Sequence, residues 1–395
     1  MIGVRYISLH ERSGYAVAAQ RIMHGLVRSG VPLTWTPMVP GAGWQLGYEP
    51  FRGDSLPGAG DMAPYCNVDI EYDTVILHLV PEYFPRWTEE LRATVGNSCL
   101  ILGHTVWETT RLPAKWPPLL SCVDGLLVPC KWNRQLFSDA KLGVPVELLP
   151  HPCLDVPVEG PERSKQGDQI RRFYSINTWT PRKAMDLALA AYLGAFDHGD
   201  QVELVIKTSP EDFGRMRGPL ARRLLGRYPA SSEAAKALLK GHENSKTVRL
   251  VTDSLPEKEL LRLHEDGDVY ISLTRSEGWG IGAFDAATLD VPVIMTGFGG
   301  QLDYLGETNQ GLVDFDLVPV CEWKGAESYT WDQTWAEPRL AHAISLMRDV
   351  RTDLAGWRQN AAELGRRLRS TYARDRVAVD LVDTIAEISR IRKEG

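Results

Sequence analysis

The sequence predicts an α/β fold made of two Rossmann-like domains, each with a parallel sheet covered by helices. Short apolar runs alternate with amphipathic helical patterns along the whole chain, and this alternation is typical of parallel sheets with helices on both faces. The runs fall into two series. The first series comprises residues 2–9, 74–79, 99–102 and 125–128, and the second comprises residues 173–176, 202–206, 248–251, 269–273 and 291–295.

A segment without apolar periodicity separates the two series. Residues 154–169 are rich in proline, glycine and charge, which is typical of a linker. We therefore expect an N-terminal domain over residues 1–152 and a C-terminal domain over residues 171–372. Within the first domain, Ser13 is placed to cap a helix that ends just before Gly30.

Length and composition limit the classes of function. The chain has 395 residues, of which 44% are apolar and 24% are charged, as is ordinary for soluble globular proteins. Its formal net charge of −7 provides no general basic field for nucleic acid. We see no leader segment and no apolar run long enough to span a bilayer. The six cysteines show no C-x-x-C spacing. We therefore expect a cytoplasmic protein with reduced cysteines.

Two segments are predicted to be irregular, residues 35–64 and residues 320–338. The first contains Trp44, Tyr48 and Phe51, whose rings would either stack on a sugar or pin a surface loop. Both alternatives stay open. The second segment carries four further aromatic residues with the same two interpretations: Trp323, Tyr329, Trp331 and Trp335.

Residues 215–246 are rich in basic side chains. One interpretation is a face for an anionic lipid surface or acceptor, which would bring the protein to the periphery of a membrane. The other, which the acidic overall charge favours, is a solvated helical face. The basic residues are Arg215, Arg217, Arg222, Arg223, Arg227, Lys236 and Lys240.

A glycine-rich turn follows the predicted strand at 269–273. Alternating glycines at Gly278, Gly280 and Gly282 let the backbone approach a ligand closely and leave amide groups at a helix start, where an anion is favoured. Glu277 and Asp285, eight residues apart, suit the hydroxyl groups of a sugar and a ribose. The alternative is a tight strand-to-helix turn in which Glu277 only complements the helix dipole.

Cations follow two neighbouring strands of the second domain. Arg182 and Lys183 come after residues 173–176, and Pro181 suggests that both lie in the first turn of a helix. Cations are unfavourable there unless an anion such as a diphosphate binds. Lys207 ends the strand at 202–206, and the alternative for all three cations is simple solvation.

The order of these residues resembles a known family. Residues 276–287, the Pro-Val-Ile run at 292–294 and Gly299-Gly300 are similar to the E-x7-E signature of retaining glycosyltransferases with the GT-B fold, glycosyltransferase family 4. The first half of the chain is similar more loosely. In the second half, residues 181–183 resemble the diphosphate-binding segment of the family, and residues 251–263 resemble its base-contacting strand and helix. In the first half, residues 13–15 resemble a glycine loop and residues 103–105 a Gly-His-Thr segment. Residues 107–109 with 112–113 are typical of mannosyltransferase-like members, and residues 149–151 resemble the end of the first domain.

The resemblance implies a GT-B fold, in which two Rossmann-like domains face each other across a cleft and the last helix, within residues 373–395, crosses back onto the first domain. It implies retaining transfer of a hexose from a GDP- or UDP-sugar to a glycan, a lipid-linked sugar or a small molecule, without a bound metal or another cofactor. Glu277 would bind hydroxyl groups of the sugar, and His104 would lie near it. The implied donor-binding residues are Gly14, Arg182, Lys183, Lys207, Leu255, Gly278, Trp279, Gly280, Ile281 and Asp285.

Several features differ from the pattern of the family or leave alternatives open. Asp285 is one methylene shorter than the usual glutamate, and Asn177 stands where many members carry an arginine. Two D-x-D spacings, at 266–268 and 314–316, are interpreted as turns or caps, and His78 as structural. The alternative functions are a related epimerase or phosphorylase, a non-catalytic nucleotide-sugar-binding protein and a dinucleotide-dependent oxidoreductase. The oxidoreductase is disfavoured because no full G-x-G-x-x-G motif is present.

Overall fold

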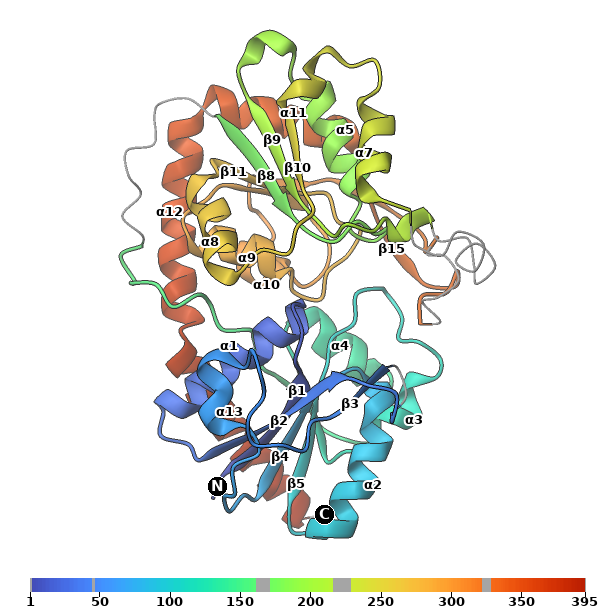
Figure 1. Cartoon of the computed structure of the whole chain (residues 1–395), viewed down its shortest axis with the longest axis vertical. Helices are drawn as coiled ribbons and strands as arrows, with labels where there is room; N and C mark the ends of the chain where they lie inside the picture. Colours follow the sequence, from blue (N-terminus) through green and yellow to red (C-terminus); the bar gives the residue numbers. More distant parts are fainter. Residues whose placement is uncertain (1, 45–46, 161–170, 216–228, 322–327, 395) are drawn as a thin grey trace. The chain divides into compact units, whose positions relative to one another are not determined.

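The computed structural model describes residues 2–44, 47–160, 171–215, 229–321 and 328–394. These residues form two compact units (Figure 1). Unit 1 comprises Met1–Trp107, Leu112–Asp155 and Thr371–Gly395, and unit 2 comprises Glu108–Arg111 and Val156–Ser370. The four residues Glu108–Arg111 therefore belong to unit 2, although the chain on either side of them belongs to unit 1.

Unit 1 contains a seven-stranded sheet in the order β3-β2-β1-β4-β5-β6-β7. All neighbouring strands are parallel except β3, which runs antiparallel to β2. The order reverses direction between β1 and β4. The strands are β1 (Val4–Leu9), β2 (Leu33–Pro40), β3 (Tyr48–Pro50), β4 (Thr74–His78), β5 (Leu100–His104), β6 (Gly125–Val128) and β7 (Val146–Leu148).

The prediction of an irregular segment at 35–64 is wrong, because the region contains most of β2, all of β3 and a 3-10 helix, η2 (Gly60–Tyr65). The proline and glycine content of the window obscured a strand whose residues 33–38 are buried throughout. Such a strand needs no alternation of polar and apolar residues. Trp35 lies in the core, and its Nε1 donates a hydrogen bond to Ser8 Oγ at 3.0 Å.

Helices α1 (Gly14–Arg28) and α13 (Arg374–Glu394) pack together and share one core with the strands. As predicted, Ser13 caps α1, accepting from the Ala16 amide, and Gly30 follows the helix end with a φ of 75°. The other helices of this unit are η3 (Pro81–Tyr83), α2 (Phe84–Val95), α3 (Trp116–Leu120) and α4 (Lys131–Asp139).

Unit 2 contains a six-stranded parallel sheet in the order β10-β9-β8-β11-β12-β13, with a reversal between β8 and β11. A separate antiparallel pair, β14-β15, contains residues 334–338, where an irregular segment was predicted. Trp335 is buried there and Trp331 is exposed, whereas Trp323 lies outside the described residues. The strands are β8 (Arg172–Ile176), β9 (Glu203–Lys207), β10 (Val248–Val251), β11 (Val269–Ser272), β12 (Val293–Thr296), β13 (Leu312–Val313), β14 (Phe315–Pro319) and β15 (Thr334–Pro338).

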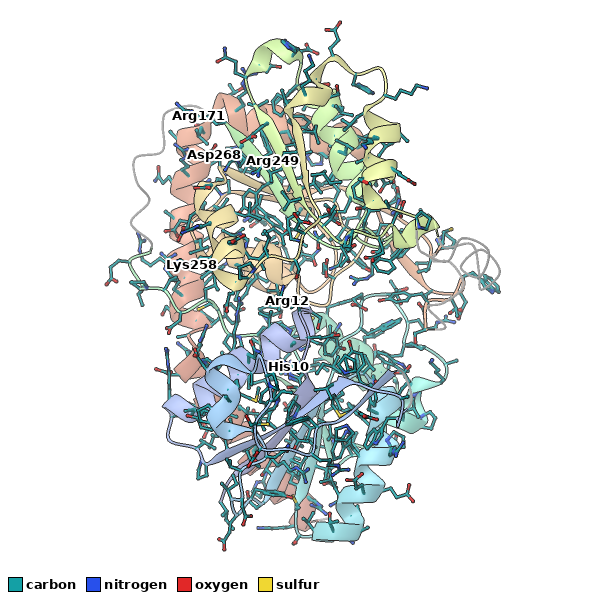
Figure 2. All side chains as sticks on the ribbon, viewed as in Figure 1. His10, Arg12, Arg171, Arg249, Lys258 and Asp268 are labelled. Atoms are coloured by element: carbon teal, nitrogen blue, oxygen red, sulfur yellow. The ribbon has the colours of Figure 1, made fainter. Side chains whose placement is uncertain are left out.

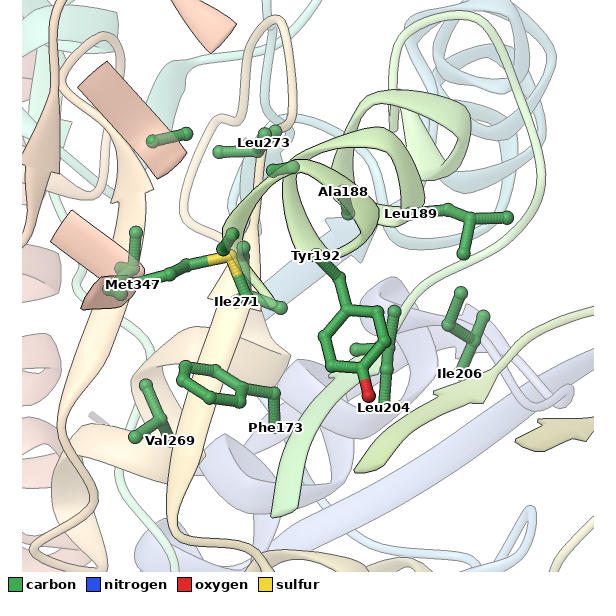
Figure 3. Close-up of a cluster of buried hydrophobic side chains, with 14 of the residues drawn as sticks. Phe173, Ala188, Leu189, Tyr192, Leu204, Ile206, Val269, Ile271, Leu273 and Met347 are labelled. Carbon is green, nitrogen blue, oxygen red and sulfur yellow. The ribbon is translucent and has the colours of Figure 1, made fainter. Parts of the chain in front are cut away.

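The main core of unit 2 lies where helices pack on one face of this sheet (Figure 3). Phe173, Leu204 and Ile271 on the strands and Leu189 and Met347 on the helices belong to this cluster, and all five are buried. Burial of each such side chain contributes about 1.5–3 kcal/mol. The helices of this unit are α5 (Met185–Ala195), η4 (His198–Asp200), η5 (Phe213–Arg215), α7 (Ser231–Leu239), η6 (Glu243–Thr247), α8 (Glu257–Asp266), α9 (Ile281–Thr288), α10 (Leu302–Leu305), α11 (Leu340–Thr352) and α12 (Leu354–Thr371).

The two D-x-D spacings have structural partners. Asp268 Oδ2 accepts the amides of Arg171 and Arg172, each at 2.9 Å, at the start of β8 (Figure 2). Asp316 pairs with Arg339 at 2.7 Å. Within the described part of the chain, no group of three or more His, Cys, Asp and Glu side chains has a geometry that holds a metal ion. Among the same residues, no helix is both long and apolar enough to cross a bilayer.

The basic segment can be described only in part. Lys236 and Lys240 are exposed at the end of α7. The other basic residues of the segment lie outside the described residues: Arg217, Arg222, Arg223 and Arg227. The side chain of Arg215 is not described either.

Candidate functional site

Polar groups gather at the carboxyl edge of the unit 2 sheet, where the strand order reverses. Asn177 follows β8, donating from its amide to Lys207 O at 3.0 Å and from Nδ2 to Ser272 Oγ at 3.1 Å. These contacts connect the ends of β8, β9 and β11. In open α/β sheets, ligands bind outside the carboxyl ends of the strands at this kind of reversal. The geometry therefore places a candidate ligand site here.

Arg182 and Lys183 lie in the turn before α5, so the prediction that they occupy the first helical turn is wrong. The helix begins at Met185 after Ala184, whose φ of 45° is left-handed, and Asp186 supplies an acidic group to its first turn. An acid there complements the helix dipole better than two cations would. The Arg275 amide donates to Arg182 O at 2.7 Å and anchors the turn beside the end of β11.

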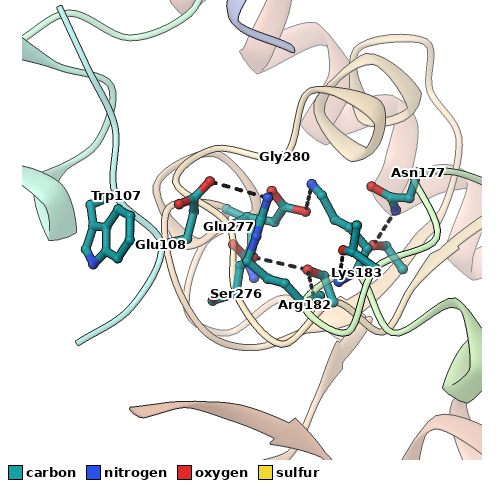
Figure 4. A network of polar contacts seen from close by, with 12 residues as sticks. Trp107, Glu108, Asn177, Arg182, Lys183, Ser276, Glu277 and Gly280 are labelled. Carbon is teal, nitrogen blue, oxygen red and sulfur yellow. Dashed lines mark hydrogen bonds and ion pairs between the residues drawn. The ribbon is translucent and has the colours of Figure 1, made fainter. Parts of the chain in front are cut away.

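The two cations converge on one carboxylate (Figure 4). Lys183 Nζ donates to Glu277 Oε1 at 2.5 Å, and Arg182 Nη1 lies 3.3 Å from Glu277 Oε2. Arg182 Nη1 also donates to Ser276 O at 2.7 Å. Only 16% of each cationic side chain and 7% of the Glu277 side chain is exposed. The hydroxyl of Ser276 is buried beside them and has no hydrogen-bond partner in the described structure.

The electrostatics of this trio keep the carboxylate ionised. Burial by itself raises the pKa of Glu277, but the charges of Lys183 and Arg182 outweigh burial and leave that pKa below its ordinary value. Burial lowers the pKa of Lys183, and Glu277 opposes this shift only in part. The trio therefore brings two basic groups and one ionised carboxylate to a largely buried place.

Two glycines shape the turn between β11 and α9. Gly280 caps α9 with a φ of 84°, a conformation that residues with a Cβ rarely adopt. Gly299 has a φ of 105°, and a Cβ there would lie 2.6 Å from Glu277 O. The amide of Gly300 donates to the same carbonyl oxygen at 2.8 Å. The backbone that carries Glu277 is thus fixed, and the first amides of α9 lie next to it in sequence without intrahelical acceptors.

The remaining predicted donor residues of unit 2 lie at various places along this edge. Lys207 Nζ donates to Thr208 O at 2.8 Å, and burial lowers the pKa of Lys207. Asp285 is buried in the second turn of α9, and Leu255 is half-buried between β10 and α8. The buried Trp279 ring packs against Phe284 and Tyr304, with ring centroids 5.2 and 5.3 Å away. Gly278 is buried and Ile281 is half-buried.

Unit 1 holds a different cluster at the carboxyl edge of its own sheet. His78 ends β4 and His104 ends β5, in register with each other, with ring centroids 3.9 Å apart. The ring centroid of His151, which follows β7, lies 5.7 Å from the ring centroid of His104. His78 Nδ1 is 2.8 Å from the hydroxyl of Tyr6, whereas both ring nitrogens of His104 are buried without a hydrogen-bond partner in the described structure.

All three histidines are uncharged at neutral pH. Burial lowers the pKa of His104 to about 3. Burial, with the neighbouring rings as a further cause, also takes the pKa values of His78 and His151 well below the ordinary value. From the sequence, His104 was predicted to be functional and His78 structural, and the cluster of three was not predicted. The rule that parallel strands end at one edge would have grouped His78 with His104, whereas no strand was predicted before His151.

The glycine loop of unit 1 lies beside this cluster. Gly14 is the exposed first residue of α1. The next residue, Tyr15, has its hydroxyl 3.1 Å from Thr105 Oγ1, and the Val106 amide donates to it at 3.3 Å. The structure therefore brings together the Gly-Tyr and His-Thr segments that were predicted separately.

One charged residue of the unit 2 site was not assigned a role from the sequence. Glu108 Oε1 lies 3.4 Å from Arg182 Nη2. It entered the sequence analysis only as part of a Trp-Glu-Thr similarity. Nothing local signals the contact, because its partner is on the other side of the linker.

Two Rossmann-like units with polar clusters at the carboxyl edges of their sheets are the architecture of the GT-B fold, as predicted. Residues 132–381 match the family described as "Family 4 Glycosyltransferase in conflict systems". This match spans more than half of the chain, so the chain belongs to that family. The resemblance to glycosyltransferase family 4 seen in the sequence is thereby confirmed. No curated protein matches the sequence.

Solved structures show the same fold at low sequence identity. An α,α-trehalose-phosphate synthase (UDP-forming) from Burkholderia vietnamiensis is 13% identical with a TM-score of 0.65, and the alignment covers 100% of this chain and 99% of that one. The E. coli trehalose-6-phosphate structure with bound UDP-2-fluoro glucose is 12% identical with a TM-score of 0.61, over 96% and 98%. A TarM variant from S. aureus, in complex with fondaparinux, α-GlcNAc-glycerol and UDP, is 10% identical with a TM-score of 0.52, over 78% of this chain and 54% of TarM. The chain thus spans about half the length of TarM.

Proposed function

We propose that the protein transfers a hexose from a nucleoside diphosphate sugar to an acceptor hydroxyl group, with retention at the anomeric carbon. The observation that carries this proposal is the convergence of Arg182 and Lys183 on Glu277 at the strand reversal of unit 2. Family membership and the UDP ligands named for the E. coli and S. aureus structures support it. GDP and UDP sugars are both candidate donors.

Different residues of the site are proposed to bind different parts of the donor. A diphosphate is the natural partner for Arg182, Lys183 and the first amides of α9, because guanidinium, ammonium and helix-terminal groups all bind phosphate oxygens. When the diphosphate takes the cations, Glu277 is released to accept hydroxyl groups of the sugar. Asp285, farther along α9, is proposed for the ribose.

The chemistry proposed here is positioning together with charge stabilisation. Breaking the glycosidic bond puts negative charge on the leaving diphosphate, and fixed cations in a dry site stabilise that charge in the transition state. We propose no metal or other cofactor, since Arg182 and Lys183 supply positive charge at the leaving group. In unit 1, the uncharged ring of His104 is proposed to hydrogen-bond the transferred sugar.

A thermal-shift series with UDP, GDP, ADP and their sugars tests the proposal, because a ligand that binds only the folded state raises its Tm. At least one nucleoside diphosphate should raise the Tm, and its sugar should be consumed when a suitable acceptor is present. If no member of the series shifts the Tm, the proposed donor class is wrong.

Lys183→Ala should weaken nucleoside diphosphate binding by about 10- to 100-fold, as expected for a lost charge-assisted hydrogen bond, and leave nucleoside binding unchanged. Isothermal titration calorimetry measures both affinities. The matched control is Lys236→Ala, which removes an exposed lysine of the same unit. An equal loss of nucleoside and diphosphate affinity would argue against the phosphate assignment.

A further inference from the structure

The four residues Glu108–Arg111 are fixed on unit 2 by several hydrogen bonds. The Thr110 amide donates to Thr334 O at 3.1 Å, the Thr334 amide donates to Thr110 Oγ1 at 3.1 Å, and the two hydroxyls are 2.7 Å apart. Thr109 Oγ1 donates to the buried Gln333 Oε1 at 3.0 Å. The segment is therefore anchored to β15 and to the residue before it.

This anchoring holds the Glu108 carboxylate against the site (Figure 4). Its Oε2 accepts the hydroxyl of Tyr329 at 2.7 Å, and its Oε1 lies 3.4 Å from Arg182 Nη2. The side chain of Glu108 is 15% exposed and that of Arg182 is 16% exposed. Since Arg182 Nη1 faces Glu277, the guanidinium group lies between two carboxylates.

The second carboxylate changes the charge balance. Arg182 and Lys183 bring two basic groups, and Glu277 and Glu108 bring two carboxylates, so these four side chains are balanced without a ligand. A largely buried cation requires such a partner, because an unpaired charge is costly to bury. A diphosphate that binds Arg182 must compete with the carboxylate that is already there.

We propose that Glu108 is the built-in counter-ion of Arg182, which competes with the diphosphate of the donor and favours release of the nucleoside diphosphate after transfer. This inference rests on the proposed function, because it assumes that Arg182 binds the diphosphate. It adds to the residues that determine donor affinity one that belongs to unit 2 but is flanked in sequence by unit 1. Tyr329 acts through Glu108, since its hydroxyl fixes the carboxylate in this position.

The substitution Glu108→Gln tests the contribution of the negative charge of Glu108 separately from its shape. The amide oxygen of glutamine can still face Arg182, and its amide nitrogen can donate to the hydroxyl of Tyr329, whereas the competing negative charge is gone. We expect the Kd of a nucleoside diphosphate to fall about tenfold, and most of the gain to persist at higher salt, because salt screens a largely buried pair much less than an exposed one. Product inhibition by that nucleotide should strengthen in parallel, and nucleoside binding should stay unchanged.

The control is Glu203→Gln, the same chemical change at the opposite edge of the sheet, where Glu203 pairs with Arg172 at 2.6 Å. This variant should bind nucleotides like the wild type. On an Arg182→Ala background, the gain from Glu108→Gln should disappear, because its partner is absent. Tyr329→Phe loosens the carboxylate without touching Arg182 and should give a smaller gain in the same direction, which keeps the test available if Glu108→Gln does not fold.

The experiment is calorimetric titration of wild type and variants with UDP, GDP and ADP at two salt concentrations. Tighter binding by Glu108→Gln that depends on Arg182 supports the inference. Unchanged or weaker binding by Glu108→Gln, or a gain that persists without Arg182, overturns it while leaving the proposed function intact. If neither wild type nor Glu108→Gln binds any of the three nucleotides, both the inference and the proposed donor class are overturned.

Discussion

Both units bury titratable side chains, but the buried carboxylate of unit 2 is ionised and the buried histidines of unit 1 are uncharged. In unit 2, Glu277 is buried with Lys183 and Arg182 and stays ionised. In unit 1, His78, His104 and His151 are buried beside one another and are uncharged. Both clusters occupy the carboxyl edge of a parallel sheet. The difference shows that the available partner, rather than burial alone, decides whether a buried group carries charge.

This difference matches the chemistry that each cluster offers. Fixed charges suit a phosphate group whose charge grows as the glycosidic bond breaks. Neutral imidazole rings provide a hydrogen-bond donor and an acceptor without adding charge, which suits sugar hydroxyl groups. Perturbing one cluster should therefore affect charge binding, and perturbing the other should affect sugar handling and acid stability.

Acid stability is expected to show the largest difference between the two clusters. The folded-state pKa values of the three histidines are lowered, and the unfolded chain takes up protons near pH 6.5. Below that pH the unfolded state binds more protons, so stability is fully present above pH 6.5 and is lost as pH falls toward the folded pKa, which for His104 is about 3. Each histidine should cost about 1.4 kcal/mol per pH unit in the free energy of unfolding.

Denaturant unfolding at pH 7, 6 and 5 measures this dependence. His104→Gln should make it shallower by the contribution of one histidine, and His198→Gln, which changes an exposed histidine, should leave it as in the wild type. A free energy of unfolding that stays constant between pH 7 and pH 5 would contradict the account of the unit 1 cluster.

The next effect in size is that of Glu277→Gln on turnover. Loss of the charge that we propose to hold the reacting sugar should reduce kcat by about 10²- to 10³-fold, the range seen when an electrostatic contact to a reacting group is removed. Nucleoside diphosphate binding should persist or strengthen, because the cations lose a competing carboxylate. Steady-state kinetics and calorimetry on one preparation measure both. Wild-type turnover, or nucleotide binding that is lost together with turnover, would remove Glu277 from its proposed role.

The smallest effect is expected for His104→Asn. Loss of the neutral hydrogen bond that we propose between His104 and the sugar should lower turnover by about tenfold, while the Kd of the nucleoside diphosphate stays as in the wild type. This pattern is the reverse of that expected for Lys183→Ala, so the pair separates sugar handling from phosphate binding. If both variants weaken nucleotide binding equally, the division of roles between the two clusters fails.

The sequence predicts best those features that depend on neighbouring residues. The Ser13 cap, the glycine after α1 and the short apolar runs of both sheets are local signals, and the structure shows the corresponding elements. The prediction is wrong at residues 35–64 because a strand buried on both faces has no alternation and this one carries proline. It is also wrong about the helix start at Pro181, because a left-handed Ala184 delays α5.

The features that the sequence does not reveal depend on contacts across long separations. His78 and His104 are paired in the register of β4 and β5, and His151 joins them from the segment after β7, a strand that was not predicted. Glu108 reaches Arg182 only because four residues flanked by unit 1 are anchored to β15. Glu277 and Lys183 were predicted separately, as a carboxylate after one strand and a cation after another. The rule that strands end at one edge correctly indicates that they share a site.

A crystal structure with a bound nucleoside diphosphate shows whether the unit 2 cations hold the diphosphate. We expect phosphate oxygens within hydrogen-bond distance of Arg182, of Lys183 and of the first amides of α9, with Glu277 turned toward the sugar position. A nucleotide bound elsewhere, with the pairs between Glu277 and both cations intact, would overturn this assignment.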